Sequence, residues 1–232
     1  MLIVIEYIQD KEFFHISVPK FYSQFPEWSL NETRFIGKTT NPFFSYYDKT
    51  SYQVLDKTKT TAYPFNKIAN VMNEIISGRT QIPHDLPNFY HCNPNRCFSE
   101  LYSYFKDYLL LTREWIYEEV RKESFPHLPS RQKGLWVIPI NESLKASLTF
   151  WEKNLVSNEN AKFLKLKLTG KLHLTSEEFL LSDSLSLDQF RQTAFKYWLG
   201  CNNPKNPEQL ECIFEGFASV THIYDSLEEI NF

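Results

Sequence analysis

Apolar residues alternate with polar residues, or gather in short runs, over four segments of the chain. Three of these segments are predicted as strands, over residues 11–18, 134–140 and 162–173. In the last of them Lys165 and Lys167 alternate with leucines, which is typical of a strand with one polar face. The fourth segment, Gln209–Tyr224, is predicted as two short strands joined by a turn at Gly216.

Helical spacing of apolar residues is found in four other segments. These predicted helices cover residues 65–77, 99–123, 141–155 and 186–199. The last begins with a capping box, in which Ser186 and Gln189 satisfy each other's backbone N–H groups. Residues 19–64 are rich in proline and aromatic residues. We expect this region to be irregular, and its part from 35 to 63 to act as a lid, because active-site lids tend to be long and irregular.

Strands and helices follow one another without a regular βαβ repeat. The sequence therefore predicts an α+β fold rather than a doubly wound parallel sheet. A length of 232 residues is ordinary for one such domain, and the chain has no internal repeat and no low-complexity tract. We therefore expect a single domain over residues 1–232.

Composition and charge exclude several classes of protein. Lys and Arg number 25 against 28 Asp and Glu, and the net charge of −3 excludes a strongly basic surface that coats a polyanion. With six glycines, the chain has no glycine-rich phosphate loop. Its longest aliphatic run, residues 2–5, is far below the roughly 20 apolar residues of a membrane span. The N-terminus lacks the basic start of a secretory signal, so we expect a cytoplasmic protein without membrane attachment.

The four cysteines form no C-x-x-C pair, so we expect reduced thiols and no disulfide. His91 and Cys92, close to Cys97, are the nearest approach to a zinc site, but no second pair of ligands lies at a suitable spacing. The sequence therefore predicts no bound metal.

Three short segments carry the candidate functional side chains. His15 lies inside the first predicted strand, and Ser130 and Arg131 come shortly before the second. Arg131 offers a planar set of donors to a phosphate or carboxylate, unless it is an ordinary solvated arginine. In the last segment, alternation places Glu211 and Glu215 on one face, and a carboxylate in such apolar surroundings either reaches solvent or has partners.

The segments around these side chains resemble motifs of one protein superfamily, in the expected order along the chain. Phe14–Ser17 resembles the first-strand motif of ADP-ribosyltransferases, especially the form found in DNA-modifying toxins. Pro129–Arg131, followed by a strand, resembles a mid-chain signature of a bacterial family in that superfamily. Leu210–Gly216 is similar to the late strand that carries the catalytic glutamate. Softer similarities lie between these motifs, at Asn41–Phe44 and Tyr197–Gly200.

The resemblance implies a split, mixed β-sheet with flanking helices and an NAD⁺-binding cleft. NAD⁺ is then a co-substrate, Glu211 and His15 are the catalytic residues, and no metal takes part. The cofactor-binding residues suggested by the resemblance and by the aromatic early region are His15, Ser17, Asn41, Tyr46, Ser130 and Arg131. We expect His15 and Glu211 to lie on adjacent central strands, with both side chains facing one cleft.

The chemistry implied by the resemblance needs a carboxylate. Breaking the bond between nicotinamide and ribose develops positive charge on the ribose, as in glycoside hydrolysis. A fixed carboxylate beside that charge stabilises the transition state more than the ground state. Glu211 is favoured over Glu215 for this role, because Glu211 opens its strand whereas Glu215 directly precedes the turn expected at Gly216.

The implied reaction transfers ADP-ribose to a macromolecule, with RNA or DNA favoured as the acceptor, as in bacterial toxins of toxin–antitoxin and anti-phage systems. An antitoxin or chaperone protein is then an expected partner. An RNA 2′-phosphotransferase, which shares the fold and NAD⁺ but needs several basic residues around a phosphate, is one alternative. A catalytically silent binding module is another, although such a module has no reason to keep Glu211 across a cleft from His15.

Overall fold

A computed structural model of the chain describes residues 5–22, 25–49, 53–55, 62–64, 77, 94–155, 161–180, 186–201 and 205–232. Its contacts divide the chain into two compact units, residues 49–110 and a larger unit of residues 1–48 with 111–232. In the smaller unit, strands β3 (Gln53–Leu55) and β4 (Ala62–Pro64) pair antiparallel. The prediction of one ADP-ribosyltransferase-like domain over the whole chain stays a prediction.

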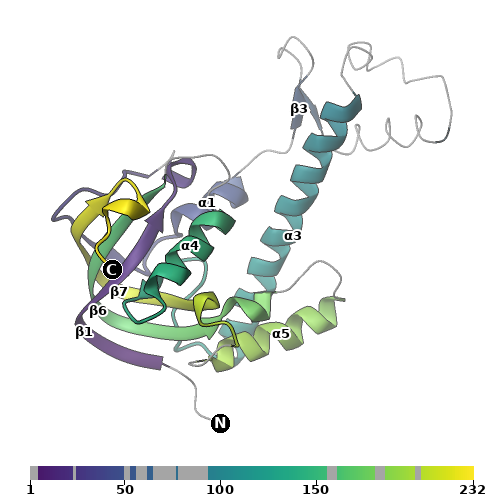
Figure 1. The fold of residues 1–232 in the computed structure, drawn as a ribbon. Helices are drawn as coiled ribbons and strands as arrows, with labels where there is room; N and C mark the ends of the chain where they lie inside the picture. Colours follow the sequence, from purple (N-terminus) through teal and green to yellow (C-terminus); the bar gives the residue numbers. More distant parts are fainter. Residues whose placement is uncertain are drawn as a thin grey trace. The chain divides into compact units, whose positions relative to one another are not determined.

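The larger unit is built on a five-stranded sheet in the order β2–β7–β5–β1–β6, with a further pairing of β7 to β6 (Figure 1). Its strands are β1 (Ile5–Ser17), β2 (Thr33–Ile36), β5 (Leu135–Pro139), β6 (Lys162–Ser176) and β7 (Leu210–Tyr224). Strand β6 pairs extensively with both β1 and β7, and the short β5 joins β1 to β7. These four strands therefore form a closed circuit of pairings, and all of them contribute side chains to the main core.

The predicted α+β class is confirmed, but the sheet is not mixed. All pairings among the described strands are antiparallel. In the closed circuit β1 and β7 run in one direction and β5 and β6 in the other, so strands of like direction are never neighbours. The predicted strands over residues 11–18, 134–140 and 162–173 are confirmed as β1, β5 and β6, and β1 and β6 are longer than predicted.

Among the described residues, four α-helices and several 3₁₀ turns accompany the strands. The α-helices are α1 (Pro42–Lys49), α3 (Pro94–Ser124), α4 (Leu144–Leu155) and α5 (Leu187–Leu199). The 3₁₀ turns are η1 (Pro19–Tyr22), η3 (Glu177–Leu180), η4 (Pro207–Gln209) and η5 (Leu227–Glu229). Among the described helices, none is long and apolar enough to cross a membrane.

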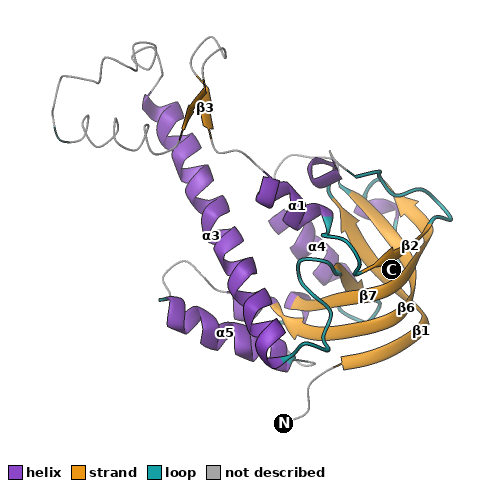
Figure 2. Ribbon diagram, turned by 180° about the vertical axis from the view of Figure 1, so that it is seen from behind, coloured by secondary structure: helices purple, strands orange, loops and turns teal. Residues whose placement is uncertain are grey.

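Helix α5 packs on the C-terminal part of α3, as Figure 2 shows from behind. The Trp198 indole N–H donates to the Tyr117 carbonyl at 2.7 Å, and both side chains belong to a second core cluster that also includes Ile213 of β7. The predicted capping box at the start of α5 is confirmed, since the Ser186 and Gln189 side chains each accept from the other's backbone N–H.

Other predicted boundaries differ from the structure. The region expected to be irregular contains β2 and α1, because the Asn41 side chain accepts the Phe44 N–H and so begins a helix at Pro42. Helix α3 begins at Pro94 rather than Ser99, since proline fits the first turn of a helix. The helix predicted over residues 65–77 lies outside the described residues, apart from Ser77. Much of the predicted lid over 35–63 also lies outside them.

Strand β7 is one continuous strand, so the predicted turn at Gly216 is wrong. Gly216 pairs with Gly170 of β6 and has a backbone φ of +146°. A Cβ atom at Gly216 would lie 2.4 Å from the Thr169 carbonyl oxygen and 2.8 Å from the Gly170 Cα. The glycine therefore allows two backbones to approach closely within the sheet, which is the other common role of glycine in a strand.

Replacing Gly216 by alanine tests this contact. The methyl group meets backbone atoms that cannot move without breaking the β6–β7 pairing, so we expect the free energy of unfolding to fall by about 2–5 kcal/mol. Gly37→Ala is the matched control: its φ is +112°, but the atoms nearest to the new methyl belong to the flexible Glu215 side chain. Urea denaturation should show a clearly larger loss for Gly216→Ala, and equal losses would contradict the close-approach argument.

Candidate functional site

A buried arginine, Arg131, connects two helices and one strand of the larger unit. Both Nε and Nη2 of Arg131 donate to the carboxylate of Glu114, at 2.8 and 2.9 Å. Its Nη1 donates to Glu211 Oε1 at 2.6 Å and to the Tyr197 hydroxyl, which itself donates to the same Glu211 oxygen at 2.9 Å. All four side chains are buried, with Arg131 only 3% exposed.

The partners of Arg131 come from parts of the chain that are far apart in sequence. Glu114 lies on α3, Tyr197 on α5 and Glu211 at the start of β7, while Arg131 lies in the turn that leads into β5. Although burial opposes the charge of Arg131, the two carboxylates raise its pKa well above the ordinary value. Burial likewise opposes the charge of Glu114, but the field of Arg131 lowers its pKa overall. Arg131 and Glu114 therefore stay ionised inside the protein.

A second buried carboxylate lies one helical turn further along α3. Glu118 accepts from Arg121 at 2.8 and 3.0 Å and from the Ser130 hydroxyl at 2.9 Å. The Ser130 hydroxyl in turn accepts the backbone N–H of Gln132 at 3.2 Å. Glu114 and Glu118, four residues apart on one helical face, therefore hold two consecutive residues of the turn before β5.

The site contains a cavity of about 140 Å³. It lies between β1, β5, the start of β7 and the residues around η3, and is lined mainly by apolar and aromatic side chains. Its polar and indole-bearing lining residues include His15, Asn41, Arg113, Arg131, Trp136 and Glu211. By volume it accepts a group of roughly the size of one aromatic ring, since an apolar cavity of about 150 Å³ binds benzene.

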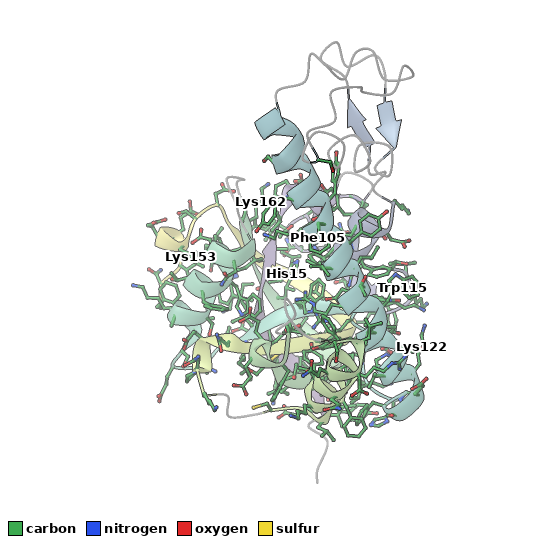
Figure 3. The ribbon with its side chains drawn as sticks, turned by 90° about the vertical axis from the view of Figure 1, so that its right-hand side faces the viewer. His15, Phe105, Trp115, Lys122, Lys153 and Lys162 are labelled. Carbon is green, nitrogen blue, oxygen red and sulfur yellow. The ribbon has the colours of Figure 1, made fainter. Side chains whose placement is uncertain are left out.

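His15 lies on β1 in the interior of the larger unit, whereas Lys122 and Lys153 lie on its outside (Figure 3). The ring nitrogen Nδ1 is 2.9 Å from the Trp136 carbonyl oxygen. A carbonyl only accepts hydrogen bonds, so Nδ1 carries the proton and Nε2 is the accepting nitrogen. Burial lowers the pKa of His15 to about 4, against a smaller opposing effect of the Trp136 carbonyl. His15 is therefore neutral at physiological pH.

His15 and Glu211 line the same cavity, but their strands are not adjacent. Strand β5 lies between β1 and β7, and its Trp136 contributes the carbonyl that binds His15. The two Glu211 carboxylate oxygens differ: Oε1 accepts from Arg131 and Tyr197, whereas Oε2 is buried and has no hydrogen-bond partner. A buried carboxylate oxygen without a donor is costly, so it indicates a place where a ligand or water donates.

Strand alternation around Glu211 is as predicted. Glu211 and Ile213 face the α3–α5 side, whereas Cys212 and Phe214 belong to the main core. Glu215 is half-buried, and its carboxylate lies 4.0 Å from Lys171 Nζ on β6. Glu215 is not among the residues that line the cavity.

The other predicted cofactor-binding residues are differently placed. Asn41 lines the cavity, but its side-chain N–H groups donate to the carbonyls of Arg131 and Gly134, at 2.7 and 3.0 Å. Tyr46 packs edge-on against Phe21, with ring centroids 5.4 Å apart. Ser17 and Ser130 are buried, and neither is among the cavity-lining residues, nor is Tyr46. The donors of Arg131 engage protein groups, so its observed contacts hold Glu211 rather than a phosphate.

Sequence reasoning missed the buried carboxylates of α3. On this helix the apolar Trp115 is 50% exposed, while Glu114 and Glu118 are among the least exposed side chains. The sequence does contain one signal for their burial. Glu114 and Glu118 lie three residues before and one residue after Tyr117, which is fully buried, and residues three or four apart lie on one helical face. Arg113 and Trp136 were also missed, because nothing in their local sequence distinguishes them from ordinary core or surface residues. Tyr197 begins a segment with a softer similarity to the superfamily, but the sequence assigned it no role.

Among the described residues, no group of three His, Cys, Asp or Glu side chains is placed to hold a metal ion. His91 and Cys92 lie outside the described residues, and the structure describes only the backbone of Cys97. The prediction of no zinc and no disulfide at these cysteines therefore stays a prediction. Cys212 is buried, and its pKa is raised by burial and by the nearby charge of Glu211, so its thiol stays protonated.

Glu114→Gln should destabilise the protein strongly, because it leaves Arg131 buried with one fewer countercharge. Breaking a buried ion pair in this way costs about 3–5 kcal/mol. Glu119→Gln is the matched control on the same helix, since Glu119 pairs with Arg191 at 2.6 Å but both are about half exposed. We expect a loss of at most about 1 kcal/mol for the control. Similar free energies of unfolding for the two variants in urea would contradict the structural importance of the network.

The neutral state of His15 predicts a pH dependence of stability. Its pKa is about 4 in the folded chain against an ordinary value of 6.5, so between these values the unfolded state binds more protons. The free energy of unfolding should therefore decrease as the pH is lowered from 6.5 to 4, and His15 should contribute about 3 kcal/mol to this decrease. Urea denaturation at both ends of the window should show a smaller fall for His15→Gln than for the unaltered protein. Equal falls would mean that His15 titrates normally.

Comparison with models of protein families matches residues 13–228 to a family described as "Protein of unknown function (DUF2441)". A search of curated proteins finds no match to the chain. The matched range includes His15, the α3 carboxylates, Arg131, Tyr197 and Glu211, and it spans all five strands of the main sheet at least in part. The chain therefore belongs to the DUF2441 family.

Proposed function

We propose that this protein is an NAD⁺-dependent ADP-ribosyltransferase that modifies a macromolecule, with nucleic acid as the favoured acceptor. The observation that carries the proposal is the shared cavity of His15 and Glu211. The resemblance implies these two residues as the catalytic pair, and they come from opposite ends of the chain. Their meeting in one cavity is what the proposed reaction requires. The proposal includes an ADP-ribosyltransferase-like fold, with which the observed α+β sheet is compatible.

The carboxylate of Glu211 suits the reaction because it is held in one position. Arg131 and Tyr197 both donate to Oε1, which leaves Oε2 for a donor from the substrate, such as a ribose hydroxyl. Cleavage of the bond to nicotinamide develops positive charge on the ribose. A preorganised negative charge in a site of low polarity stabilises that charge without reorganisation during the reaction.

The cavity fits part of NAD⁺ rather than all of it. A volume of about 140 Å³ accommodates one ring, and Trp136 and Phe43, which pack edge-to-face against each other, supply part of the aromatic lining. In the proposed binding mode the nicotinamide ring enters this cavity, and the diphosphate and adenosine lie outside it. As the resemblance implies, the neutral ring of His15 would contact the ribose on the nicotinamide side.

The charges at the site favour ADP-ribosyl transfer over an RNA 2′-phosphotransferase. Such an enzyme needs basic residues that contact a phosphate, and the two arginines that line the cavity, Arg113 and Arg131, both donate to Glu114. A silent binding module is also less well supported. Oε2 of Glu211 is buried without a partner, and such an oxygen destabilises the fold. A protein that performs no reaction has no reason to retain this carboxylate.

The lysines of β6 do not form an open basic patch for the acceptor. Lys162, Lys165, Lys167 and Lys171 each lie within 4.0 Å of a carboxylate, from Glu27, Glu12, Asp10 and Glu215 respectively. These pairs compensate the positive charge that would otherwise attract a polyanion. The preference for RNA or DNA over protein therefore rests on the resemblance, and the experiment must include all three classes.

The test is incubation of the purified chain with NAD⁺ labelled in its adenylate part and separate pools of RNA, DNA and protein. We expect label to enter one pool, with stoichiometric release of nicotinamide. Glu211→Gln keeps the shape of the side chain but removes its charge, so transfer should fall about 10²-fold or more. Glu215→Gln is the matched control on the same strand face and should reduce transfer much less.

Two outcomes would contradict this proposal. Absence of both labelled product and nicotinamide with every pool would exclude the activity. Normal transfer by Glu211→Gln, together with loss of transfer by Glu215→Gln, would show that the carboxylate is wrongly assigned. Urea denaturation of both variants establishes that each is folded under the assay conditions.

A further inference from the structure

A second carboxylate, that of Glu177, lies close to Glu211. In the antiparallel β6–β7 pair, Thr175 is directly opposite Glu211, and β6 ends at Ser176. Glu177 follows as the first residue of η3. Residues diagonally related in an antiparallel pair, two positions from the direct partner, share a face of the sheet at a separation of about 7–8 Å. Glu177 lies two residues past Thr175, just beyond the end of the strand, and is near enough for the negative charge of Glu211 to act on it.

The 3₁₀ turn that begins at Glu177 also borders the cavity. Leu180, its last residue, lines the cavity together with Glu211 and Arg113. Nη1 of Arg113 donates to the Leu180 carbonyl at 3.3 Å, which ties η3 to α3 at this point. Glu177 is half-buried, so it is reachable from solvent, whereas Glu211 is buried.

The electrostatic surroundings of the two carboxylates differ. Partial burial and then the negative charge of Glu211 raise the pKa of Glu177, and Arg113 on α3 opposes this shift. Helix α5 also packs against η3, but its charged residues Asp188 and Arg191, like Lys196, are exposed. Glu211, by contrast, is held by two donors at one oxygen. When two neighbouring carboxyl groups lie in different environments, one commonly acts as a negative charge and the other as a general acid or base.

We propose that Glu177 is the general base that accepts the proton of the acceptor nucleophile during transfer of ADP-ribose. This inference rests on the proposed function. A hydroxyl or amino group of the acceptor forms a bond to the ribose carbon that nicotinamide leaves. Nicotinamide departs with the electron pair of the broken bond, and the proton of the nucleophile passes to the Glu177 carboxylate. Glu211 stabilises the positive charge on the ribose, and Glu177, closer to solvent, serves the incoming group.

The first test separates transfer from cleavage of NAD⁺ by the full chain. Nicotinamide release without acceptor reports cleavage with water as the nucleophile, and labelled acceptor reports transfer. Loss of a general base typically lowers a rate by 10²–10⁴-fold, so Glu177→Gln should reduce transfer by about 10²-fold while cleavage without acceptor persists. Glu178→Gln, a half-buried neighbour on the same turn, is the matched control and should leave both rates near those of the unaltered protein.

The outcomes distinguish the inference from the proposed function. If Glu177→Gln transfers normally, or if it loses cleavage and transfer equally, Glu177 is not the base, although the proposed function stands. If the unaltered protein neither cleaves NAD⁺ nor labels an acceptor, the proposed function fails and the role of Glu177 fails with it.

A second test examines the coupling of the carboxylates without any activity. In the unaltered protein, carbon-13 NMR titration should give Glu177 a pKa above that of ordinary glutamates. In Glu211→Gln the pKa of Glu177 should fall, because removal of a neighbouring negative charge favours ionisation. An unchanged pKa of Glu177 in that variant would show that the two groups do not interact, and would overturn the inference.

Discussion

The buried guanidinium of Arg131 is the interaction on which the rest of the site depends. Each of its partners comes from a different element, so α3, α5 and β7 are held at fixed positions by one side chain. Buried ion pairs often contribute little net stability compared with apolar residues of the same size. Their value here is geometric, because the network leaves one oxygen of Glu211 with two donors and the other with none. The unpartnered Oε2 lowers the stability of the fold, while the two donors at Oε1 hold the carboxylate in a defined position.

The closed circuit of strands explains why His15 and Glu211 meet although their strands are not paired. The short strand β5 fills the gap between β1 and β7, and its Trp136 has a role toward each side. Its carbonyl accepts from His15, and its ring lies beneath the guanidinium that holds Glu211, with 5.4 Å between Arg131 Cζ and the ring centroid. One residue on the connecting strand thus orients both members of the pair.

Much of the fold follows from local patterns, whereas the polar network does not. The capping box of α5 and the alternation in β1 and β6 depend on neighbouring residues, so the sequence alone predicts them. Gly216 was misread because a glycine that makes a turn and a glycine that allows close backbone approach have the same local sequence. The partners of Arg131 are 17 to 80 residues away, and no local rule predicts which carboxylates of a helix are buried. His15 and Glu211 were proposed from motif resemblance rather than from a local rule, and the structure places both at one cavity.

The contacts of Asn41 have a consequence for how this part of the molecule opens. Its side chain accepts the N–H that begins α1 and donates to two carbonyls of the turn that carries Arg131, and its backbone N–H donates to Gln132. Fraying of the first turn of α1 and loosening of the turn before β5 therefore break the same set of hydrogen bonds. We therefore expect the start of α1 and the turn before β5 to unfold together in local opening, so that the start of the helix helps to hold the turn that positions the Arg131 guanidinium.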